Sequence, residues 1–337
     1  MQRYDDQLSS RTSPISHGCA FATHWLARGV AIALAATAGG CLDTAPSAHE
    51  VKQTSIGPVI SLPTHVPGDY DWDGDSDLVL QQDTTAFIAF WLTDQFEPYG
   101  EHTDTSTPYG PATTNWRLAA SADLNGDDRP DLVFQNNDSQ RIVAWHMRDL
   151  ERIGGGFTTP LNDEDPTSQL VCSAYFNDDH QADLVFQSSD RTRRTIYVWI
   201  MDPDNPMVRL SRRVVSSAIP GFSVNDFRVA GCGDFSGNGL ADLVLRGPAG
   251  NVTIAILEDF QAIEQYRIPT PTRDWTWTLG AITELGDTVH PGHLQLIWQH
   301  DDNAVEAWAM NYWEYDHTVS LRGPVSQTNP WRVVGPR

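Results

Sequence analysis

The sequence predicts an all-β fold, a β-propeller of five blades with four antiparallel strands in each blade. An acidic loop followed by an apolar run recurs along the chain, and its equivalent residues are 54, 52, 59 and 53 positions apart: Asp77, Asp131, Asp183, Asp242 and Gln295. The segments between these loops are short and rich in Val, Ile, Phe and Trp, which favour strands. A repeat of about 50 residues with four such segments is typical of a propeller blade.

Each repeat supplies its strands in one order: a segment ending at the acidic loop, the apolar run after the loop, a second apolar segment and a more polar one. The second apolar segment recurs at 87–92, 142–147, 196–201, 252–257 and 305–310. In most copies both of its faces are apolar, which predicts burial between two neighbouring sheets. The final segment, from Trp331, resembles the segments that end at acidic loops. It can therefore close the ring by joining either the first or the last blade.

The acidic loops predict calcium sites. Alternate residues at loop positions 1, 3, 5 and 9 direct their side chains at one centre, and oxygen ligands in a flexible cage suit Ca²⁺. Gly74 at position 6 permits a sharp turn. The expected ligands, loop by loop, are Asp69, Asp71, Asp73 and Asp77; Asp123, Asn125, Asp127 and Asp131; Asn177, Asp179 and Asp183; and Asp234, Ser236, Asn238 and Asp242.

Two of the loops depart from this pattern. In the third, Tyr175 replaces the first acid and weakens the expected site. The fifth runs from Glu284 to Gln295, is three residues longer and has lost the pattern, so we expect it to hold no calcium. The alternative for every loop is a polar turn between strands, because Asp and Gly also favour turns.

The repeat, GDFSGNGLADLVLR at 233–246 followed by an apolar strand, resembles the FG-GAP/VCBS repeats of bacterial exported proteins. It is similar to the calcium-binding blades of integrin alpha propellers and of some fungal lectins. The resemblance covers about residues 62–337. It implies an integrin-alpha-like β-propeller with calcium held at the blade loops, and it implies no single activity, because fold does not fix function.

The N-terminal region predicts export. Residues 29–38 form an apolar run that is too short to span a bilayer, and Arg28 precedes it. Because Cys41 follows small residues, the segment 1–41 resembles a bacterial lipoprotein signal peptide, which implies lipidation of Cys41 at the outer membrane or cell surface. Ordinary cleavage with an incidental cysteine is the alternative. Residues 42–61 then form a polar tether, and residues 62–337 the propeller.

The net charge of the chain limits the classes of partner that we expect it to bind. Asp and Glu number 44 against 22 Lys and Arg, a net charge of −22. This balance excludes nucleic acid as an expected partner and leaves the lipid at Cys41 as the expected membrane contact. We expect a surface binding or adhesion module for glycan or extracellular protein, with calcium as its cofactor and no catalysis. A polysaccharide lyase or hydrolase on the same scaffold is the alternative, although the sequence contains no recognised catalytic motif.

Several side chains outside the loops have competing interpretations. Cys172 and Cys232 form either a disulfide or two buried thiols. Trp145, Trp199 and Trp308 recur at one strand position, which favours core packing over sugar stacking. Trp72 lies within the first acidic loop, where exposure is expected. The pair His290 and His293 could bind a transition metal but lacks a third ligand nearby in sequence.

Overall fold

The computed structural model describes residues 68–337 apart from 83–84, 86, 95, 105–114, 191–192, 270–273 and 323–330. All of these residues belong to one compact unit that spans 60–337. The predicted signal peptide at 1–41, its Cys41 and the tether at 42–61 lie outside the described residues. Within the described ranges, no helix has the length and apolar character needed to cross a membrane.

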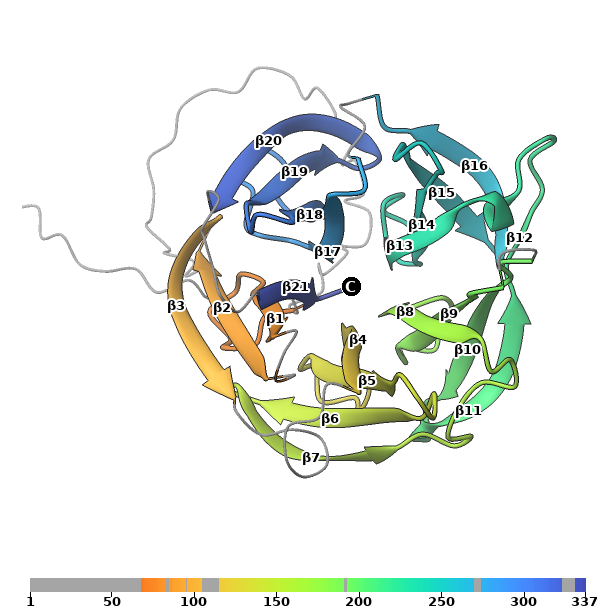
Figure 1. Ribbon diagram of the computed structural model, residues 1–337, viewed down its shortest axis with the longest axis horizontal. Helices are drawn as coiled ribbons and strands as arrows, with labels where there is room; N and C mark the ends of the chain where they lie inside the picture. Colours follow the sequence, from red (N-terminus) through yellow and green to blue (C-terminus); the bar gives the residue numbers. More distant parts are fainter. Residues whose placement is uncertain are drawn as a thin grey trace, which may run out of the picture. The chain divides into compact units, whose positions relative to one another are not determined.

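Five antiparallel sheets are arranged in a ring, as predicted (Figure 1). The strands of the first blade, from the centre outwards, are β21 (Trp331–Gly335), β1 (Leu78–Gln82), β2 (Ile88–Asp94) and β3 (Glu97–Asp104). Those of the second are β4 (Trp116–Ala122), β5 (Asp131–Asn136), β6 (Ile142–Arg148) and β7 (Glu151–Phe157). Those of the third are β8 (Ser168–Ala174), β9 (Asp183–Ser188), β10 (Ile196–Asp202) and β11 (Asn205–Val214).

The last two blades follow the same plan. The strands of the fourth are β13 (Arg228–Gly233), β14 (Asp242–Arg246), β15 (Val252–Glu258) and β16 (Gln261–Arg267), with the short parallel strand β12 (Ser216–Ser217) at its outer edge. Those of the fifth are β17 (Trp277–Thr283), β18 (Gln295–His300), β19 (Val305–Asn311) and β20 (Glu314–Arg322). The described helical structure is one 3₁₀ turn, η1 (Val224–Asp226).

The ring is closed by the last strand, β21, which pairs with β1 in the first blade. Leu80 lies opposite Val333 and Gln81 opposite Arg332 in this antiparallel pair. The sequence allowed the last strand to join either the first or the last blade, and in the structure it joins the first. The residues after β21 lie near the centre of the ring (Figure 1), where the Pro336 carbonyl accepts a 2.8 Å hydrogen bond from the Ile282 N–H.

The hydrophobic core lies between the blades. Trp145, Trp199 and Trp308 are each at most 1% exposed, which confirms that these tryptophans pack in the core. One core cluster joins Phe90 of the first blade to Phe134 of the second, so facing sheets share their apolar side chains. Burial on both faces explains why the central strands are mostly apolar, and it stabilises the ring by removing those side chains from water.

In four of the five blades, a glutamine at one position of the repeat joins the blade to the next one. Its amide oxygen accepts a backbone N–H of the next inner strand, and its amide nitrogen donates to a carbonyl two residues earlier. The sets are Gln81 with Leu118 and Trp116, Gln135 with Leu170 and Ser168, Gln187 with Val229 and Phe227, and Gln299 with Val333 and Trp331. In the fourth blade Arg246 replaces the glutamine and donates to the Trp277 carbonyl at 2.6 Å.

A disulfide links the third and fourth blades. Cys172 in β8 and Cys232 in β13 are bonded, and their Cα atoms lie 6.0 Å apart. Of the two alternatives that the sequence allowed, the structure has the disulfide. Because these inner strands belong to different sheets, the bond joins blades that otherwise share only packing and hydrogen bonds.

Candidate metal centre

The acidic loops all lead into the second strand of a blade. We name them loop one (69–77), loop two (123–131), loop three (175–183), loop four (234–242) and loop five (284–295). Loop one leads into β1, whose inner partner is β21. Because each loop occupies the same place in an equivalent blade, all five lie on one side of the ring.

The last aspartate of loops one to four is a buried anchor. In loop one, Asp77 is fully buried and accepts hydrogen bonds from the N–H groups of Tyr70 (2.8 Å) and Thr93 (3.3 Å). The same two bonds recur at Asp131 with Leu124 and Met147, at Asp183 with Phe176 and Met201, and at Asp242 with Phe235 and Leu257. This carboxylate therefore fixes the start of its loop to the third strand of its own blade.

Burial changes the acidity of these anchors. It raises the pKa of Asp77 and Asp131 to about 8, that of Asp183 to about 7 and that of Asp242 to about 6, and the backbone N–H donors only partly oppose it. Each of these buried carboxyls therefore takes up a proton at a higher pH than an exposed aspartate does. A cation beside such a carboxyl would oppose this shift.

The first aspartate closes loops one, two and four. Asp69 accepts hydrogen bonds from the N–H groups of Trp72 (2.6 Å) and Gly74 (3.0 Å), and burial raises its pKa to about 6. Asp123 and Asp234 accept the equivalent bonds from Gly126 and Asp128 and from Gly237 and Gly239. Trp72 and Gly74 have φ values of 65° and 100°. Glycine adopts this left-handed region freely, whereas Trp72 adopts it at a cost of about 1–2 kcal/mol.

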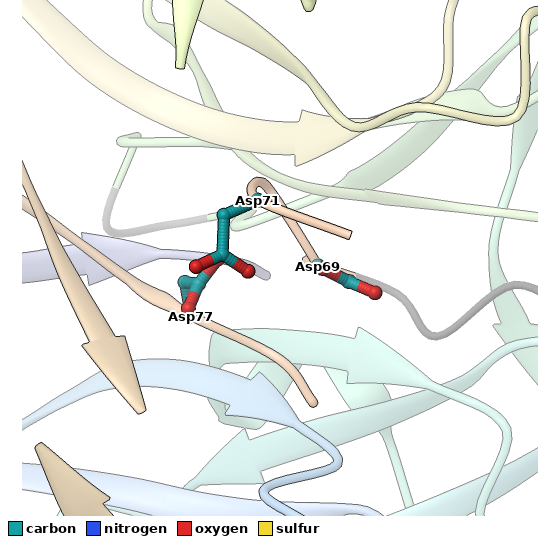
Figure 2. Close-up of side chains that lie close together, drawn as sticks. All are labelled: Asp69, Asp71 and Asp77. Atoms are coloured by element: carbon teal, nitrogen blue, oxygen red, sulfur yellow. The ribbon is translucent and has the colours of Figure 1, made fainter. Parts of the chain in front are cut away.

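Loop one brings three carboxylates together. Asp69, Asp71 and Asp77 each offer an oxygen atom, and these three atoms lie within 4.8 Å of one another (Figure 2). Figure 2 shows the carboxylate of Asp71 directed towards that of Asp77. Since calcium–oxygen bonds are about 2.3–2.6 Å long, two ligands of one ion lie at most roughly 5 Å apart. The spacing and the all-oxygen donor set therefore fit a calcium ion.

The fourth predicted ligand of loop one stands outside this group. Asp73 is exposed, and its Oδ1 accepts a 3.0 Å hydrogen bond from the Asp75 N–H. The structure thus gathers three of the four predicted side chains. Asp73 is placed at the open rim of the loop.

In loop two the predicted ligands are engaged with protein partners. Asp127 lies 3.6 Å from the guanidinium of Arg148 and accepts the N–H of Arg129 at 3.1 Å. The Asn125 amide nitrogen donates to Asp131 at 3.5 Å. Among the described residues, only loop one gathers three acidic side chains within 4.8 Å.

Loops three and four use their remaining predicted ligands in turns. Asn177 and Asp179 accept the N–H groups of Asp179 and Gln181, at 3.0 and 2.9 Å. In loop four the Ser236 hydroxyl donates to Asp234 at 3.3 Å, and the Asn238 side chain accepts the N–H of Leu240 at 2.8 Å. These side chains lie in the same loops as their buried anchors, Asp183 and Asp242.

Loop five is closed by the same kinds of bonds, made by different residues. Gln295 accepts the N–H of Leu285 at 2.6 Å, as the anchor aspartates do in the other loops. Glu284 accepts the N–H of Gly292 at 2.7 Å, in the role of the first aspartate. The replacement of Asp by Gln and Glu was visible in the sequence, but its structural equivalence was not predicted. Loop five therefore keeps one bond of each kind while losing the anchor's charge.

Other side chains on the loop side of the ring have defined partners. The rings of His290 and His293 lie parallel with centroids 5.8 Å apart, and the nearest acid to His290 is Asp316 at 3.3 Å. Trp72 is 50% exposed, as expected, and the guanidinium of Arg129 lies 4.3 Å from its ring centre. This stacking links loop one to loop two.

Comparison with known proteins gives no family assignment. No family model and no curated protein matches the chain. Among solved structures, one match is a mutant form of the Photorhabdus luminescens Tc holotoxin pore, with 17% sequence identity and a TM-score of 0.39. The match covers 78% of this chain but 12% of that chain, so this protein spans about an eighth of its length. The similarity carries no conclusion about function.

Proposed function

We propose that this protein is an exported, calcium-binding β-propeller that acts as a binding or adhesion module for glycan or extracellular protein. The observation that carries the calcium assignment is the trio Asp69, Asp71 and Asp77, whose oxygens lie within 4.8 Å of one another. Two of these side chains are buried, and both are oriented by backbone hydrogen bonds. The loop therefore holds its ligands in place before an ion arrives.

Charge supports the same assignment. Three carboxylates at this spacing repel one another when ionised, and burial increases the cost because little water screens them. A divalent cation supplies the missing positive charge and joins loop one to the first blade through Asp77. Loops two to four keep the anchor aspartate and further oxygen donors, so we propose that they also bind calcium, more weakly than loop one. Arg148 beside Asp127 competes with an ion at loop two.

The proposed location is the outer membrane or cell surface of a bacterium. It rests on the apolar run at 29–38, followed by Cys41, which would carry the lipid. The test is to express Cys41→Ala beside the natural protein and to fractionate the cells. Membrane association of the natural protein alone, with a lipid detected by mass spectrometry, is expected. Equal solubility of the two proteins would contradict the anchor.

Calcium binding can be tested by titration of the calcium-free protein with CaCl₂ in a calorimeter. Asp71→Ala should remove the tightest site, because it deletes one of the three carboxylates of the trio. Asp71 is the partly exposed member, so its loss leaves both buried carboxylates in place. Asp138→Ala is the matched control: it removes the same charge from the exposed hairpin after β5. If both variants bind calcium like the natural protein, loop one is a polar turn and the assignment is wrong.

A further inference from the structure

Trp72 occupies a position of loop one that glycine occupies in two other loops. Its φ value is 65°, and its equivalents, Gly126 in loop two and Gly237 in loop four, have φ values of 75° and 73°. Glycine adopts this conformation freely, whereas tryptophan adopts it at a cost. A Cβ atom at Gly126 would meet nothing within 4 Å beyond its chain neighbours, so this position directs a side chain outwards. The fold of the loop therefore does not explain Trp72, and strain of this kind points to a role for its ring.

The Trp72 ring contacts the neighbouring blade. The guanidinium carbon of Arg129 in loop two lies 4.3 Å from the ring centre, a distance at which a cation–π attraction operates. Asp149, in the turn between β6 and β7, pairs with the same guanidinium group. Arg129 is therefore held between an aromatic ring of loop one and a carboxylate of its own blade.

Arg129 belongs to the part of loop two that carries the predicted ligands. It is the seventh residue of the loop, and this position supplies a backbone carbonyl in calcium loops with side-chain ligands at positions 1, 3 and 5. Its N–H donates to the carboxylate of Asp127, a predicted ligand, at 3.1 Å. A shift of Arg129 therefore moves two oxygen donors of loop two together.

Trp72 is joined to the ligands of loop one in the same way. Its N–H donates to the carboxylate of Asp69 at 2.6 Å, and Asp69 is one of the three carboxylates of the trio. Without a cation these carboxylates repel one another when ionised, which opposes the conformation that holds Trp72 in place. A calcium ion would relieve the repulsion and fix Asp69. It would thereby also fix the backbone that carries the Trp72 ring.

Below this contact the two loops are joined at their bases. The first and second blades are neighbours in the ring (Figure 1). Tyr70 of loop one is 2% exposed, and its hydroxyl is hydrogen-bonded to that of Ser121 in β4. Its N–H donates to the anchor Asp77 at 2.8 Å. The bases of the loops are thus fixed by buried contacts, and the contact between Trp72 and Arg129 joins their outer parts.

We propose that Trp72 and Arg129 couple the two loops, so that calcium in loop one strengthens calcium binding in loop two. With loop one filled, the ring holds Arg129, and part of the ordering that loop two needs is complete before its own ion arrives. Coupling is reciprocal, so calcium in loop two strengthens loop one by the same factor. A cation–π contact at a partly exposed position corresponds to about a two- to fivefold change in affinity. Both are positioning residues, and the inference rests on the proposed calcium sites.

The test is a CaCl₂ titration of ¹⁵N-labelled protein followed by NMR, in which the backbone amides of Gly126 and Gly237 report loops two and four separately. In Trp72→Gly the calcium concentration that half-saturates the Gly126 signal should rise about two- to fivefold. That of Gly237 should not change. The variant introduces the residue that loops two and four have at this position, so it keeps the backbone conformation and all three carboxylates of loop one.

Trp275→Gly is the matched control. Trp275 is 51% exposed, and the guanidinium carbon of Arg246 likewise lies 4.3 Å from its ring centre. It precedes β17, at the end of that strand remote from loop five, so its loss should leave both glycine signals with the natural calcium dependence.

A second comparison separates coupling from a direct effect of Trp72 on loop two. Asp71→Ala, which removes the site in loop one, should also raise the half-saturating calcium concentration of Gly126. In that background, Trp72→Gly should have no further effect, because no ion in loop one remains to be coupled.

Three results would overturn the coupling. The first is an unchanged or lower half-saturating concentration of Gly126 in Trp72→Gly, and the second is an equal rise with and without Asp71. Either would leave calcium binding itself standing, with the loops acting independently. The third is a natural protein in which neither glycine signal responds to calcium, and this result would also refute calcium binding by loops two and four.

Discussion

The side chain of Gln299 in the fifth blade accepts a 2.8 Å hydrogen bond from the backbone N–H of Val333 in the first blade. Its amide nitrogen donates to the Trp331 carbonyl at 2.7 Å, so one side chain satisfies two backbone groups of β21. The ring is therefore closed twice, by the pairing of β21 with β1 and by this amide. The same arrangement joins the first to the second, the second to the third and the third to the fourth blade.

Loss of this amide should weaken ring closure. In Gln299→Ala the N–H of Val333 is left buried without a partner, which costs about 1–3 kcal/mol of unfolding free energy. Urea unfolding followed by tryptophan fluorescence measures the change. Gln265→Ala, an exposed glutamine on β16, is the control and should change stability by less than about 0.5 kcal/mol. Equal effects of the two substitutions would show that the amide does not close the ring.

The disulfide should contribute strongly to stability. Cys172 and Cys232 are 60 residues apart, and closing a loop of that length in the unfolded chain corresponds to about 4 kcal/mol. Cys172→Ala/Cys232→Ala should unfold at lower urea concentration than the natural protein. A reducing agent should lower the stability of the natural protein and leave that of the double variant unchanged. The disulfide would be contradicted if the reducing agent left the stability of the natural protein unchanged and both thiols reacted after denaturation without a reducing agent.

The ion pair between Asp163 and Arg212, with 2.9 Å between their nearest atoms, should make stability depend on pH. Burial of Asp163 opposes its ionisation, but hydrogen bonds from Arg212, the backbone of Asp165 and Trp199 outweigh burial and hold its pKa below the ordinary range. Because the folded state favours the charged form, its stabilisation is complete above the ordinary pKa of about 3.8 and is lost as pH falls through the lower folded value. Asp163→Asn should therefore be less stable than the natural protein at pH 7, and the difference should shrink below about pH 4. A difference that is constant from pH 3 to pH 7 would contradict this account.

The architecture could be predicted from the sequence because each repeat corresponds to one blade. Four acidic loops, a divergent fifth and the apolar segments that follow them predicted five blades, which the structure has. The burial of Trp145, Trp199 and Trp308 confirms that these tryptophans pack in the core. The partner of the last strand could not be predicted, because the segments at both ends of a ring have the same pattern. Which strand pairs with the last one depends on how the ring closes in three dimensions, and the spacing of the repeats along the chain does not specify this.

The details of the site were less predictable. Alternate spacing placed Asp69, Asp71 and Asp77 together correctly, but it also included Asp73, which lies at the exposed rim. Spacing indicates which side chains can face one centre, whereas the path of the loop decides which of them do. The hydrogen bonds by which a glutamine joins neighbouring blades were not predicted, although Gln81 and its equivalents recur in four repeats. A polar residue kept inside an apolar run was the available signal.

The most direct test of the account is thermal and urea unfolding of the protein at pH 7.5 in millimolar calcium and in EDTA. At a calcium concentration ten times its own Kd, a site stabilises the folded state by about 1.4 kcal/mol, so loops one to four, each filled to this degree, would together contribute about 6 kcal/mol. That is a large share of a typical stability of about 5–15 kcal/mol. If calcium binds the acidic loops, the natural protein should be clearly more stable in calcium than in EDTA. This difference should be smaller for Asp71→Ala and unchanged for Asp138→Ala. Superimposable curves for the natural protein would contradict it and leave the acidic loops as turns alone.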